Sequence, residues 1–472
     1  MSSKDLELLK KFFAQNYGVK FIRLHWVDYS GVLRTRIIPR ARSIRLAAGS
    51  DTYHLAQNCM ICPISTSPRC FPLEVEDWTL YPDWTSLMLC DFAPTHASVM
   101  CATGHNGTTT RNPNPEHLAR CPRTLLQTVL HNFYADYPRF QDGLLLGFEI
   151  EFVLLDESSN LASSLDRMVG YSLTAGIRAE NLAILEEIVT ALEFAGVEIY
   201  HLHTETTDQL EIALSPMAPV RAVDALMMAQ ETIRTICIRH GRRACMAPRP
   251  TLLSSGPLNG CHVHLSLNPA SSPNSLMNVT EEGQIMEDQE EQANSADYAS
   301  FLSGILRKTK ALCAFGLANY DSYCRVLGDC AGEWIGWGTH NREFPVRGMR
   351  PNRWEIRCLD TTANVYLFVA ALVASGMDGM KQTTPLTITD CPLAPQLYSP
   401  EEAERRLREY GITERMPKSL EVALKCVQED EELRGWVGEE LFAQYRRVKD
   451  IEIQHFSGMS DEARRQKFLD YF

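Results

Sequence analysis

The stretch Leu144-Leu-Leu-Gly-Phe-Glu-Ile-Glu-Phe-Val-Leu-Leu155 alternates polar and apolar side chains at its centre, as a β-strand with one polar face does. Successive side chains of a strand point to opposite faces, so Glu149 and Glu151 share one face and the apolar side chains beside them share the other. Two carboxylates on one face repel each other unless a cation lies between them. The stretch therefore predicts a strand whose polar face is a candidate metal site.

Three further stretches show the same division into an apolar and a polar face. For any single strand, an antiparallel sheet with one solvated face is the simpler explanation. A solvated face would carry lysine, and no lysine occurs between Lys310 and Lys381. Taken together, the four strands indicate a binding site, and carboxylates with one imidazole suit Mg²⁺ or Mn²⁺. The polar faces carry His262, His264 and Ser266 in residues 260–267, Arg353, Glu355 and Arg357 in residues 353–357, and Gln209 and Glu211 in residues 208–214.

Arginine is concentrated in residues 325–357. A guanidinium group binds a carboxylate or a phosphate through two parallel hydrogen bonds, which lysine cannot do. Metal-binding carboxylates that face such arginines are typical of phosphoryl transfer from a metal–nucleotide complex. The sequence has no P-loop and no G-x-G-x-x-G, which excludes Walker-type and kinase-type nucleotide sites. The arginines are Arg325, Arg342, Arg347, Arg350, Arg353 and Arg357.

The rest of the chain predicts an α+β fold with a small β-rich region before a larger one. Residues 19–39 predict a hairpin, the turn-rich residues 103–122 predict a linker, and residues 268–295 predict a surface loop. Short strands are expected near residues 73–80 and 86–91, and helices at residues 180–195, 219–240, 296–317, 363–380 and over much of the last 75 or so residues.

The composition of the 472-residue chain excludes several classes of protein. Asp and Glu outnumber Lys and Arg by 59 to 46, so a nucleic acid or an anionic membrane is not the expected partner. No apolar run approaches the roughly 18 residues that span a bilayer, and the first residues lack the pattern of a signal peptide. The 15 cysteines are therefore expected as reduced thiols in the cytoplasm, with Cys59-x-x-Cys62 as core residues.

The four strands, in this order, resemble those of the glutamine synthetase family, specifically its class I-like branch and the fungal-type glutamine synthetase-like proteins. The resemblance covers nearly the whole chain and is most specific over residues 353–367. It implies a β-grasp N-terminal domain at residues 1–112 and a catalytic domain at residues 113–472, with a curved antiparallel sheet flanked by helices. It also implies a homo-oligomeric ring in which each active site is completed by a neighbour's N-terminal domain. The matching motifs are Asp28 to Pro39, Pro122-Arg-Thr-Leu, Asn259 to Ser266, Trp337-Gly-x-x-Asn-Arg342 and Arg353 to Leu367.

The same resemblance implies an ATP-dependent carboxylate–amine ligase. In the family, ATP phosphorylates the γ-carboxylate of glutamate and ammonia displaces phosphate from the acyl phosphate, with two or three Mg²⁺ or Mn²⁺ ions in the site. The residues that match binding positions fall into five groups. The ligands of the metal nearest the transferred phosphate are matched by Glu149, His262 and Glu355, and those of the metal at the amino acid by Glu151, Glu205 and Glu211. The positions that bind glutamate and the phosphoryl group are matched by Arg325, Arg342 and Arg357, and those that bind ATP phosphates by Arg347 and Arg353, beside His264 and Ser266. The loop that lines the amino acid pocket is matched by Gly260. Arg325, Arg342 and Glu205 are the expected catalytic residues.

Three segments depart from the family pattern. The segment from His203 to Glu211 is one residue shorter than in the family and has no glycine. Residues 45–60 lack the Asp-Gly-Ser-Ser that in the family supplies the carboxylate that deprotonates ammonium. The segment after Arg325, which in the family is a flap that closes over the intermediate, lacks the family's proline. These departures affect the parts that receive ammonium, so an organic amine is an alternative nucleophile, and a non-catalytic scaffold or signalling protein is an alternative function. The pattern His-x-His, present here as His262-x-His264 and His201-x-His203, also occurs in metal-dependent hydrolases. In those enzymes the pair precedes the other metal ligands in the sequence, whereas here it follows a strand with carboxylates, so we disfavour a hydrolase.

Overall fold

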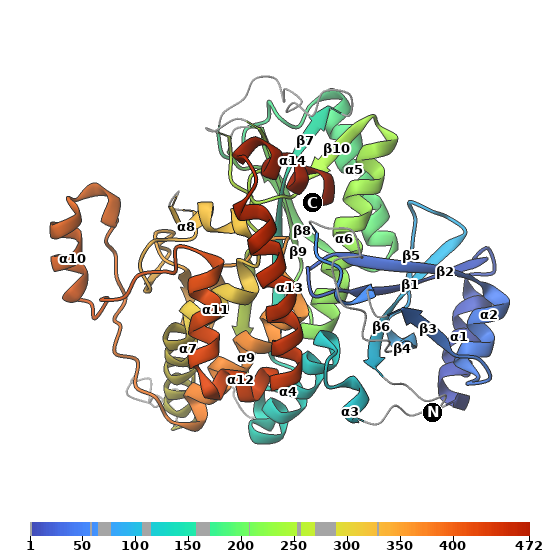
Figure 1. The fold of residues 1–472 in the computed structure, drawn as a ribbon, viewed down its shortest axis with the longest axis horizontal. Coiled ribbons are helices and arrows are strands. Elements are labelled where there is room, and N and C mark those ends of the chain that lie inside the picture. The colour runs from blue at the N-terminus through green and yellow to red at the C-terminus, as the bar shows by residue number, and fades with distance from the viewer. Residues whose placement is uncertain are drawn as a thin grey trace, which may run out of the picture.

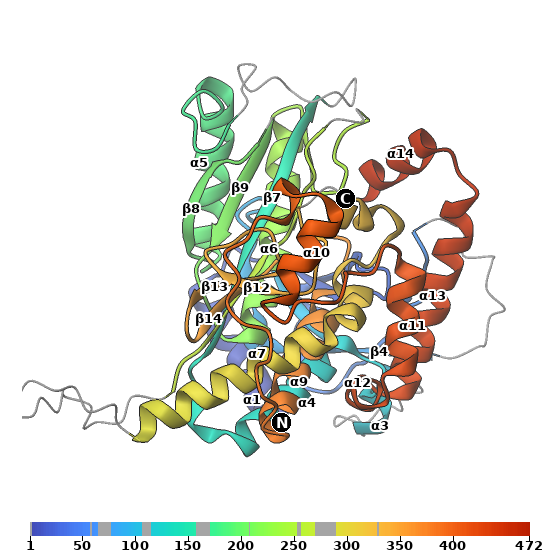
Figure 2. The ribbon, with the colours of Figure 1, turned by 90° about the vertical axis from the view of Figure 1, so that its left-hand side faces the viewer.

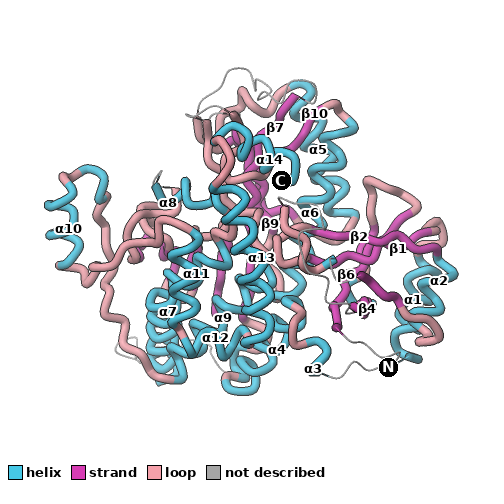
Figure 3. The backbone as a smooth tube through the Cα atoms, viewed as in Figure 1, coloured by secondary structure: helices cyan, strands magenta, loops and turns pink. Residues whose placement is uncertain are grey.

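The computed structural model describes residues 2–56, 59–64, 77–105, 115–156, 170–206, 208–252, 256–269, 289–327 and 330–472. It contains a small sheet near the N-terminus and a large sheet, with most of the helices packed around the large one (Figure 1). Strands and helices are mixed along the chain in both parts (Figure 3), so the α+β class is confirmed. No helix in these ranges is long and apolar enough to cross a membrane.

The N-terminal sheet is built on the expected hairpin. Strands β1 (Phe21–Val27) and β2 (Leu33–Pro39) pair antiparallel, and β1 also pairs in parallel with β6 (His96–His105). The strand order β2-β1-β6-β4-β3 is thus mixed, as the β-grasp expectation requires. The remaining elements are α1 (Ser2–Gln15), α2 (Arg40–Ala47), β3 (Tyr53–Ala56), β4 (Asp77–Pro82), the 3-10 helix η3 (Trp84–Ser86) and β5 (Met88–Leu89).

The large sheet carries all four strands with polar faces. Its order is β12-β13-β14-β11-β7-β9-β8, and all neighbours on this path are antiparallel except β12 and β13. The long strand β7 lies between β11 and β9, and Figure 2 shows β9 between β7 and β8. The bounds are β7 (Leu144–Asp156), β8 (Ile199–Thr204), β9 (Gln209–Leu214), β10 (Arg242–Cys245), β11 (Val263–Leu267), β12 (Trp337–Thr339), β13 (Val346–Arg350) and β14 (Arg353–Ile356).

Helices cover the large sheet and build the rest of the core. Helix α6 packs against β7 and β10, and α7 packs against α9, which also contacts α4. The bounds are α3 (Pro115–Leu118), α4 (Pro122–Asp136), η4 (Pro138–Phe140), α5 (Ala179–Phe194), α6 (Pro219–Arg239), α7 (Gln289–Gly316), η5 (Tyr320–Tyr323), α8 (Cys324–Leu327), α9 (Val365–Lys381), η6 (Pro395–Leu397), α10 (Pro400–Arg408), α11 (Leu420–Glu429), α12 (Glu431–Val437), α13 (Glu439–Ser457) and α14 (Asp461–Tyr471).

Two glycines allow α7 and α9 to touch through their backbones. A Cβ atom at Gly304 would lie 2.1 Å from the carbonyl oxygen of Ser375, and one at Gly379 would lie 2.2 Å from that of Ser300. Any larger side chain would therefore separate the two helices. Helix α9 is largely apolar and almost all of its side chains are buried, as expected for a helix in the core of a large protein.

The turn of the N-terminal hairpin is fixed to the helices of the large part. The side chain of Asn364 caps α9 by accepting a hydrogen bond from Leu367 N, and its Nδ2 donates to Asp28 O over 2.9 Å. Ser30 Oγ donates to Glu452 Oε1 over 2.7 Å, and Lys449 pairs with the other oxygen of Glu452. The small sheet is thus joined to α9 and α13 by buried polar contacts.

Three expectations from the sequence need correction or lie outside the described residues: the loop, the linker and the domain boundary. Residues 289–295 begin helix α7, although residues 268–295 were expected to form a loop; glutamate and glutamine are good helix formers, which explains the error. The rest of that loop, residues 270–288, lies outside the described residues. The expected linker contains the end of β6 and all of α3, and the expected domain boundary at residues 112–113 is also outside the described residues.

Candidate active site

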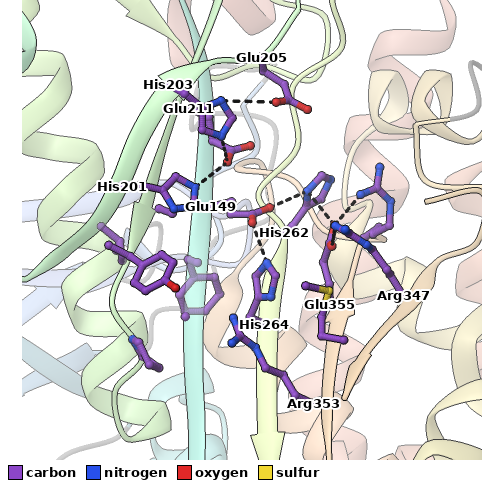
Figure 4. Close-up of a pocket in the computed structure, with 18 of the residues that line it drawn as sticks. Glu149, His201, His203, Glu205, Glu211, His262, His264, Arg347, Arg353 and Glu355 are labelled. Carbon is purple, nitrogen blue, oxygen red and sulfur yellow. Dashed lines mark hydrogen bonds and ion pairs between the residues drawn. The ribbon is translucent and has the colours of Figure 1, made fainter. Parts of the chain in front are cut away.

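The polar face of the large sheet lines a cavity of about 370 Å³. Its walls come from β7, β8, β9, β11, β13 and β14, so each polar face found in the sequence contributes (Figure 4). The apolar faces of the same strands are buried, with Ile150 and Phe152 fully inaccessible to solvent. The division into faces therefore separates the core of the protein from its candidate site.

A first cluster joins Glu149, His262 and Glu355 across three neighbouring strands. Strand β11 lies between β7 and β14, and His262 directly precedes it. His262 Nδ1 is 3.1 Å from Glu149 Oε2 and 3.5 Å from Glu355 Oε1, and the three possible ligand atoms lie within 4.8 Å of one another. Two carboxylates and one imidazole at this spacing fit a divalent ion such as Mg²⁺ or Mn²⁺. The structure thus brings together three residues that alternation placed on the polar faces of their own strands and that the resemblance grouped as ligands of one metal.

Both carboxylates of this cluster are held in the charged form. Burial raises the pKa of Glu355, but the charges of Arg357 and His262 outweigh burial and lower that pKa to about 2. Burial also opposes ionisation of Glu149, yet hydrogen bonds from His262 and His264 hold its pKa well below the usual range. Ionised carboxylates are the form that binds metal, so the cluster is ready for a cation at neutral pH.

A second cluster joins His201, His203 and Glu211 at the edge of the sheet. His203 lies opposite Glu211 in the pairing of β8 with β9, with its Nε2 3.1 Å from Glu211 Oε1. His201 Nε2 lies 3.8 Å from the same oxygen. The hydrogen bond with Glu211 raises the pKa of His203 to about 9. Within the described ranges this is the second group of three candidate ligands, whereas the resemblance grouped Glu211 with Glu151 and Glu205.

The other two carboxylates assigned to the second metal lie on either side of Glu211. Glu151 is buried and does not line the cavity; its Oε2 accepts hydrogen bonds from Gly260 N over 2.6 Å and from Gln209 Nε2 over 2.9 Å. Glu205 lines the cavity, with Oε2 3.6 Å from His203 Nδ1. Burial, together with the charges of Glu211 and Glu151, raises the pKa of Glu205 to about 7. The role of these two residues as metal ligands stays a prediction.

Arg325 lies behind the first cluster and is only 1% exposed. Its Nη2 donates to His262 Nε2 over 3.1 Å, which leaves His262 Nδ1 facing the carboxylates. A Cβ atom at Gly260 would lie 2.7 Å from both Arg325 Nη2 and His262 Nε2, so the missing side chain makes room for this contact. Neither Arg325 nor Gly260 lines the cavity, and their expected contact with substrate stays a prediction.

The remaining site residues line the cavity on its arginine-rich side. Arg347 Nη1 donates to Glu355 Oε2 over 2.8 Å, and His264 Nε2 lies 2.7 Å from Glu149 Oε1. Arg342 is half-exposed at the rim, 5.7 Å from the centre of the Tyr171 ring. Ser266, Arg353 and Arg357 complete this wall. Four further residues line the cavity and were not predicted from the sequence: Tyr171, Tyr200, His201 and His203. The spacing of the two histidines was a usable signal.

The family of the chain follows from its similarity to known proteins. Residues 119–468 match the model of the glutamine synthetase catalytic domain. The chain belongs to the glutamine synthetase family. It is 33% identical to Protein fluG of Emericella nidulans over the whole of this chain, and it spans 51% of that relative's length. It is also 26% identical to the gamma-glutamylpolyamine synthetase GlnA3 of Streptomyces coelicolor, covering 94% of this chain and 92% of the relative.

The chain is also similar to a bacterial glutamine synthetase in sequence and to a solved structure in fold. The glutamine synthetase of Staphylococcus aureus is 25% identical over 98% of this chain and 97% of its own. The fold resembles that of GmaS in complex with ADP, with a TM-score of 0.77 and 22% identity over 98% of this chain and 99% of the other. ATP and divalent metals are typical of the glutamine synthetase family, and the first cluster fits such a metal.

Two acidic residues in the departing segments are engaged away from the cavity. Asp51 pairs with Arg42 at 3.2 Å and with Arg45 at 3.7 Å. Glu333, in the segment after Arg325, pairs with Arg415 and does not line the cavity. Neither residue therefore adds a carboxylate to the cavity of the same chain.

Proposed function

We propose that this member of the glutamine synthetase family forms a γ-glutamyl amide from glutamate or a related acid, ATP and an amine, through an acyl phosphate. The observation that carries the proposal is the cluster of Glu149, His262 and Glu355, faced by arginines in one cavity. Carboxylates for a metal beside guanidinium groups for phosphates and carboxylates are what a phosphoryl transfer needs.

In the first step, a γ-carboxylate oxygen of the acid forms a bond to the γ-phosphorus of ATP, and ADP leaves with the bridging oxygen. Arg347 and Arg353 bind the phosphates of ATP and offset their charge, while Arg342 and Arg357 hold the acid and the phosphoryl group. Mg²⁺ or Mn²⁺, when bound to the first cluster, supplies positive charge for the phosphoryl oxygens. Arg325 packs behind His262, with its Nη2 3.1 Å from Nε2, and limits the movement of the ring.

In the second step, the amine nitrogen attacks the acyl carbon and inorganic phosphate leaves. The nitrogen must lose a proton, and Glu205 is the base in this proposal because it lines the cavity. Its Oε2 is buried, accepts no hydrogen bond and lies 3.6 Å from His203 Nδ1. A pKa of about 7, raised by burial and by the neighbouring carboxylates, suits that role near neutral pH.

We propose an organic amine as the preferred nucleophile. Asp51 and Glu333 are paired with arginines away from the cavity of their own chain, so fewer carboxylates are available to attract a small cation. Tyr171 and Tyr200 at the rim offer apolar surface to the carbon atoms of an amine. The relative GlnA3 is named for polyamine substrates, which supports this preference.

The assembly and the domain division belong to the same proposal. Residues 1–112 form a domain that completes the active site of a neighbouring subunit, and residues 113–472 form the catalytic domain. Closure by heterologous contacts then gives a homo-oligomeric ring. The chain spans about half the length of the fluG relative, 51%, so nothing is proposed for the rest of that relative's activity.

A non-catalytic role is the second candidate, and the ion pair of Glu333 with Arg415 is the observation that favours it, because the carboxylate in the segment after Arg325 is engaged away from the cavity. One experiment separates the two. The protein is incubated with ATP, Mg²⁺ and glutamate, with ammonium or with a panel of organic amines, and phosphate release is measured. A ligase releases more phosphate when its amine is present; a scaffold releases none above that of a Glu355→Gln variant.

A further inference from the structure

A second cavity, of about 320 Å³, is lined by described residues that all differ from those of the candidate active site. It lies between helix α7 and the chain that links α9 to α10, which runs along the outer side of α7 in Figure 1. Ser303 Oγ on α7 donates a hydrogen bond to Pro385 O over 2.9 Å and so joins the two walls. Sites for small molecules are usually clefts of roughly 300–1,000 Å³, so the size of this cavity suits a small organic ligand.

The inner wall of this cavity is apolar. Leu306 on α7 and Ile335, which precedes β12, are each 4% exposed. Leu386 and Ile388, on the chain that links α9 to α10, are half-buried and line the same space. Apolar side chains that border a cavity gain free energy when an apolar ligand displaces water from them. The wall therefore favours a ligand with an apolar body.

Arg307 adds an exposed guanidinium group to the lining of this cavity. Its Nη1 is 3.5 Å from Gln382 Oε1 and 3.4 Å from Thr384 Oγ1. Both acceptors are neutral, and both distances exceed the roughly 2.7–3.2 Å of an ordinary hydrogen bond. A guanidinium group that is held so loosely can turn toward a ligand and bind a carboxylate through two parallel hydrogen bonds.

The acidic residue among the described lining residues is already paired. Glu414 Oε2 lies 2.9 Å from Lys310 Nζ, so the ammonium group balances its charge. The guanidinium of Arg307 then leaves the cavity with a net positive charge. Thr387 and Thr413, both exposed, add hydroxyl groups that can donate to an anion. The charge and the hydroxyl groups favour an acid over an amine as the ligand.

We infer that this cavity binds a small carboxylic acid with an apolar body. The carboxylate pairs with Arg307, and the apolar body packs against the wall formed by Leu306, Ile335, Leu386 and Ile388. The site is separate from the cavity of the proposed ligase reaction, and its occupation does not depend on that reaction.

Two backbone hydrogen bonds hold one wall of the cavity in place. Ile335 N donates to Glu414 O, and Met416 N donates to Glu333 O, both over 2.9 Å. A ligand that bridges Arg307 and Ile335 makes opening of this wall less frequent. It should therefore slow the exchange of these backbone amides with solvent.

Binding of hexanoate, with hexylamine as a probe of equal length and opposite charge, tests the inference without measuring activity. A ligand-observed NMR titration of the full chain should show saturable binding of hexanoate, at least tenfold tighter than that of hexylamine or of acetate. Hydrogen exchange measured by mass spectrometry should slow in peptides that cover residues 303–311 and 411–416, and not in those that cover residues 199–216 of the first cavity. Equal binding of hexanoate and hexylamine, hexanoate binding that does not saturate, or slower exchange only in residues 199–216 would overturn the inference.

Variants separate the two parts of the site. Arg307→Gln removes the charge and should weaken hexanoate binding at least tenfold, whereas Leu386→Asn keeps the charge, removes part of the apolar wall and should weaken it several-fold. Arg408→Gln removes another exposed arginine, on α10, and should leave hexanoate binding unchanged. Because Arg307 and Arg408 are both exposed, these two variants are expected to fold, and circular dichroism verifies this. Hexanoate binding that is unchanged in Arg307→Gln would contradict the inference.

Discussion

Arg357 and Glu355 are joined by a 2.5 Å hydrogen bond from Nη1 to Oε1, at the end of β14 on the polar face of the large sheet. Arg347 occupies the second oxygen of Glu355, so two guanidinium groups hold one carboxylate. A second hydrogen bond, from Arg357 Nη2 to Cys330 O over 2.9 Å, fixes the plane of the Arg357 guanidinium. The candidate metal ligand therefore also orients a candidate substrate-binding arginine.

Replacing Arg357 with lysine tests this orientation. The Arg357→Lys variant keeps the charge but loses the planar fork, so binding of the acid should weaken by about 1.5–3 kcal/mol, the scale of hydrogen bonds to charged groups. The measurement is the KM for the acid in ATP turnover. Arg408→Lys, on the exposed helix α10, is the matched control and should leave the KM unchanged. An unchanged KM in Arg357→Lys would contradict the role given to this residue.

Removal of divalent metal should destabilise the protein. The ionised carboxylates of Glu149 and Glu355 flank His262, and a bound cation stabilises the folded state that presents them. An ion at 100 times its Kd adds about 2.7 kcal/mol to the free energy of unfolding. Calorimetry with Mn²⁺ and with a chelator measures the effect, which should shrink in Glu355→Gln. Equal unfolding temperatures in both conditions would show that the cluster binds no ion.

Adding a methyl group at Gly260 should disturb the first cluster from behind. The new Cβ would lie 2.7 Å from Arg325 Nη2 and His262 Nε2, so Gly260→Ala should lower stability by about 1–3 kcal/mol, as overpacking does. Urea unfolding measures the change. In the control variant Gly435→Ala, no atom lies within 4 Å of the new Cβ, and this change in helix α12 should stabilise by about 0.5–1 kcal/mol. A neutral Gly260→Ala would mean that Arg325 and His262 separate without cost.

The size of the particle in solution tests the proposed assembly. If residues 1–112 complete a neighbour's site, the protein must form a closed homo-oligomer at micromolar concentration. Light scattering coupled to size exclusion gives the mass directly. A mass near the 53.3 kDa of one chain would contradict the ring and favour the non-catalytic candidate.

The polar faces that carry the first cluster could be predicted because alternation is local information, whereas the grouping of its three residues came from the resemblance to the family. Alternation along a strand places Glu149, Glu355 and the His262 side chain on polar faces whatever the rest of the fold does. The second cluster depends on how β8 pairs with β9, and an irregularity between Ile199 and His201 in that pairing cannot be read from the residues. For the same reason the sequence did not reveal that Arg325 is buried behind His262, since burial depends on packing between distant segments.

The most direct test of the proposed reaction follows an oxygen atom. Glutamate labelled with ¹⁸O in its γ-carboxylate is incubated with the protein, ATP, Mg²⁺ and the amine that gives the most phosphate release, and the phosphate is analysed by mass spectrometry. If an acyl phosphate forms, the phosphate that leaves keeps the carboxylate oxygen, so each phosphate from fully labelled acid should carry one ¹⁸O atom. Phosphate that is released without ¹⁸O would show that ATP is hydrolysed by water, and would contradict the proposed ligase reaction.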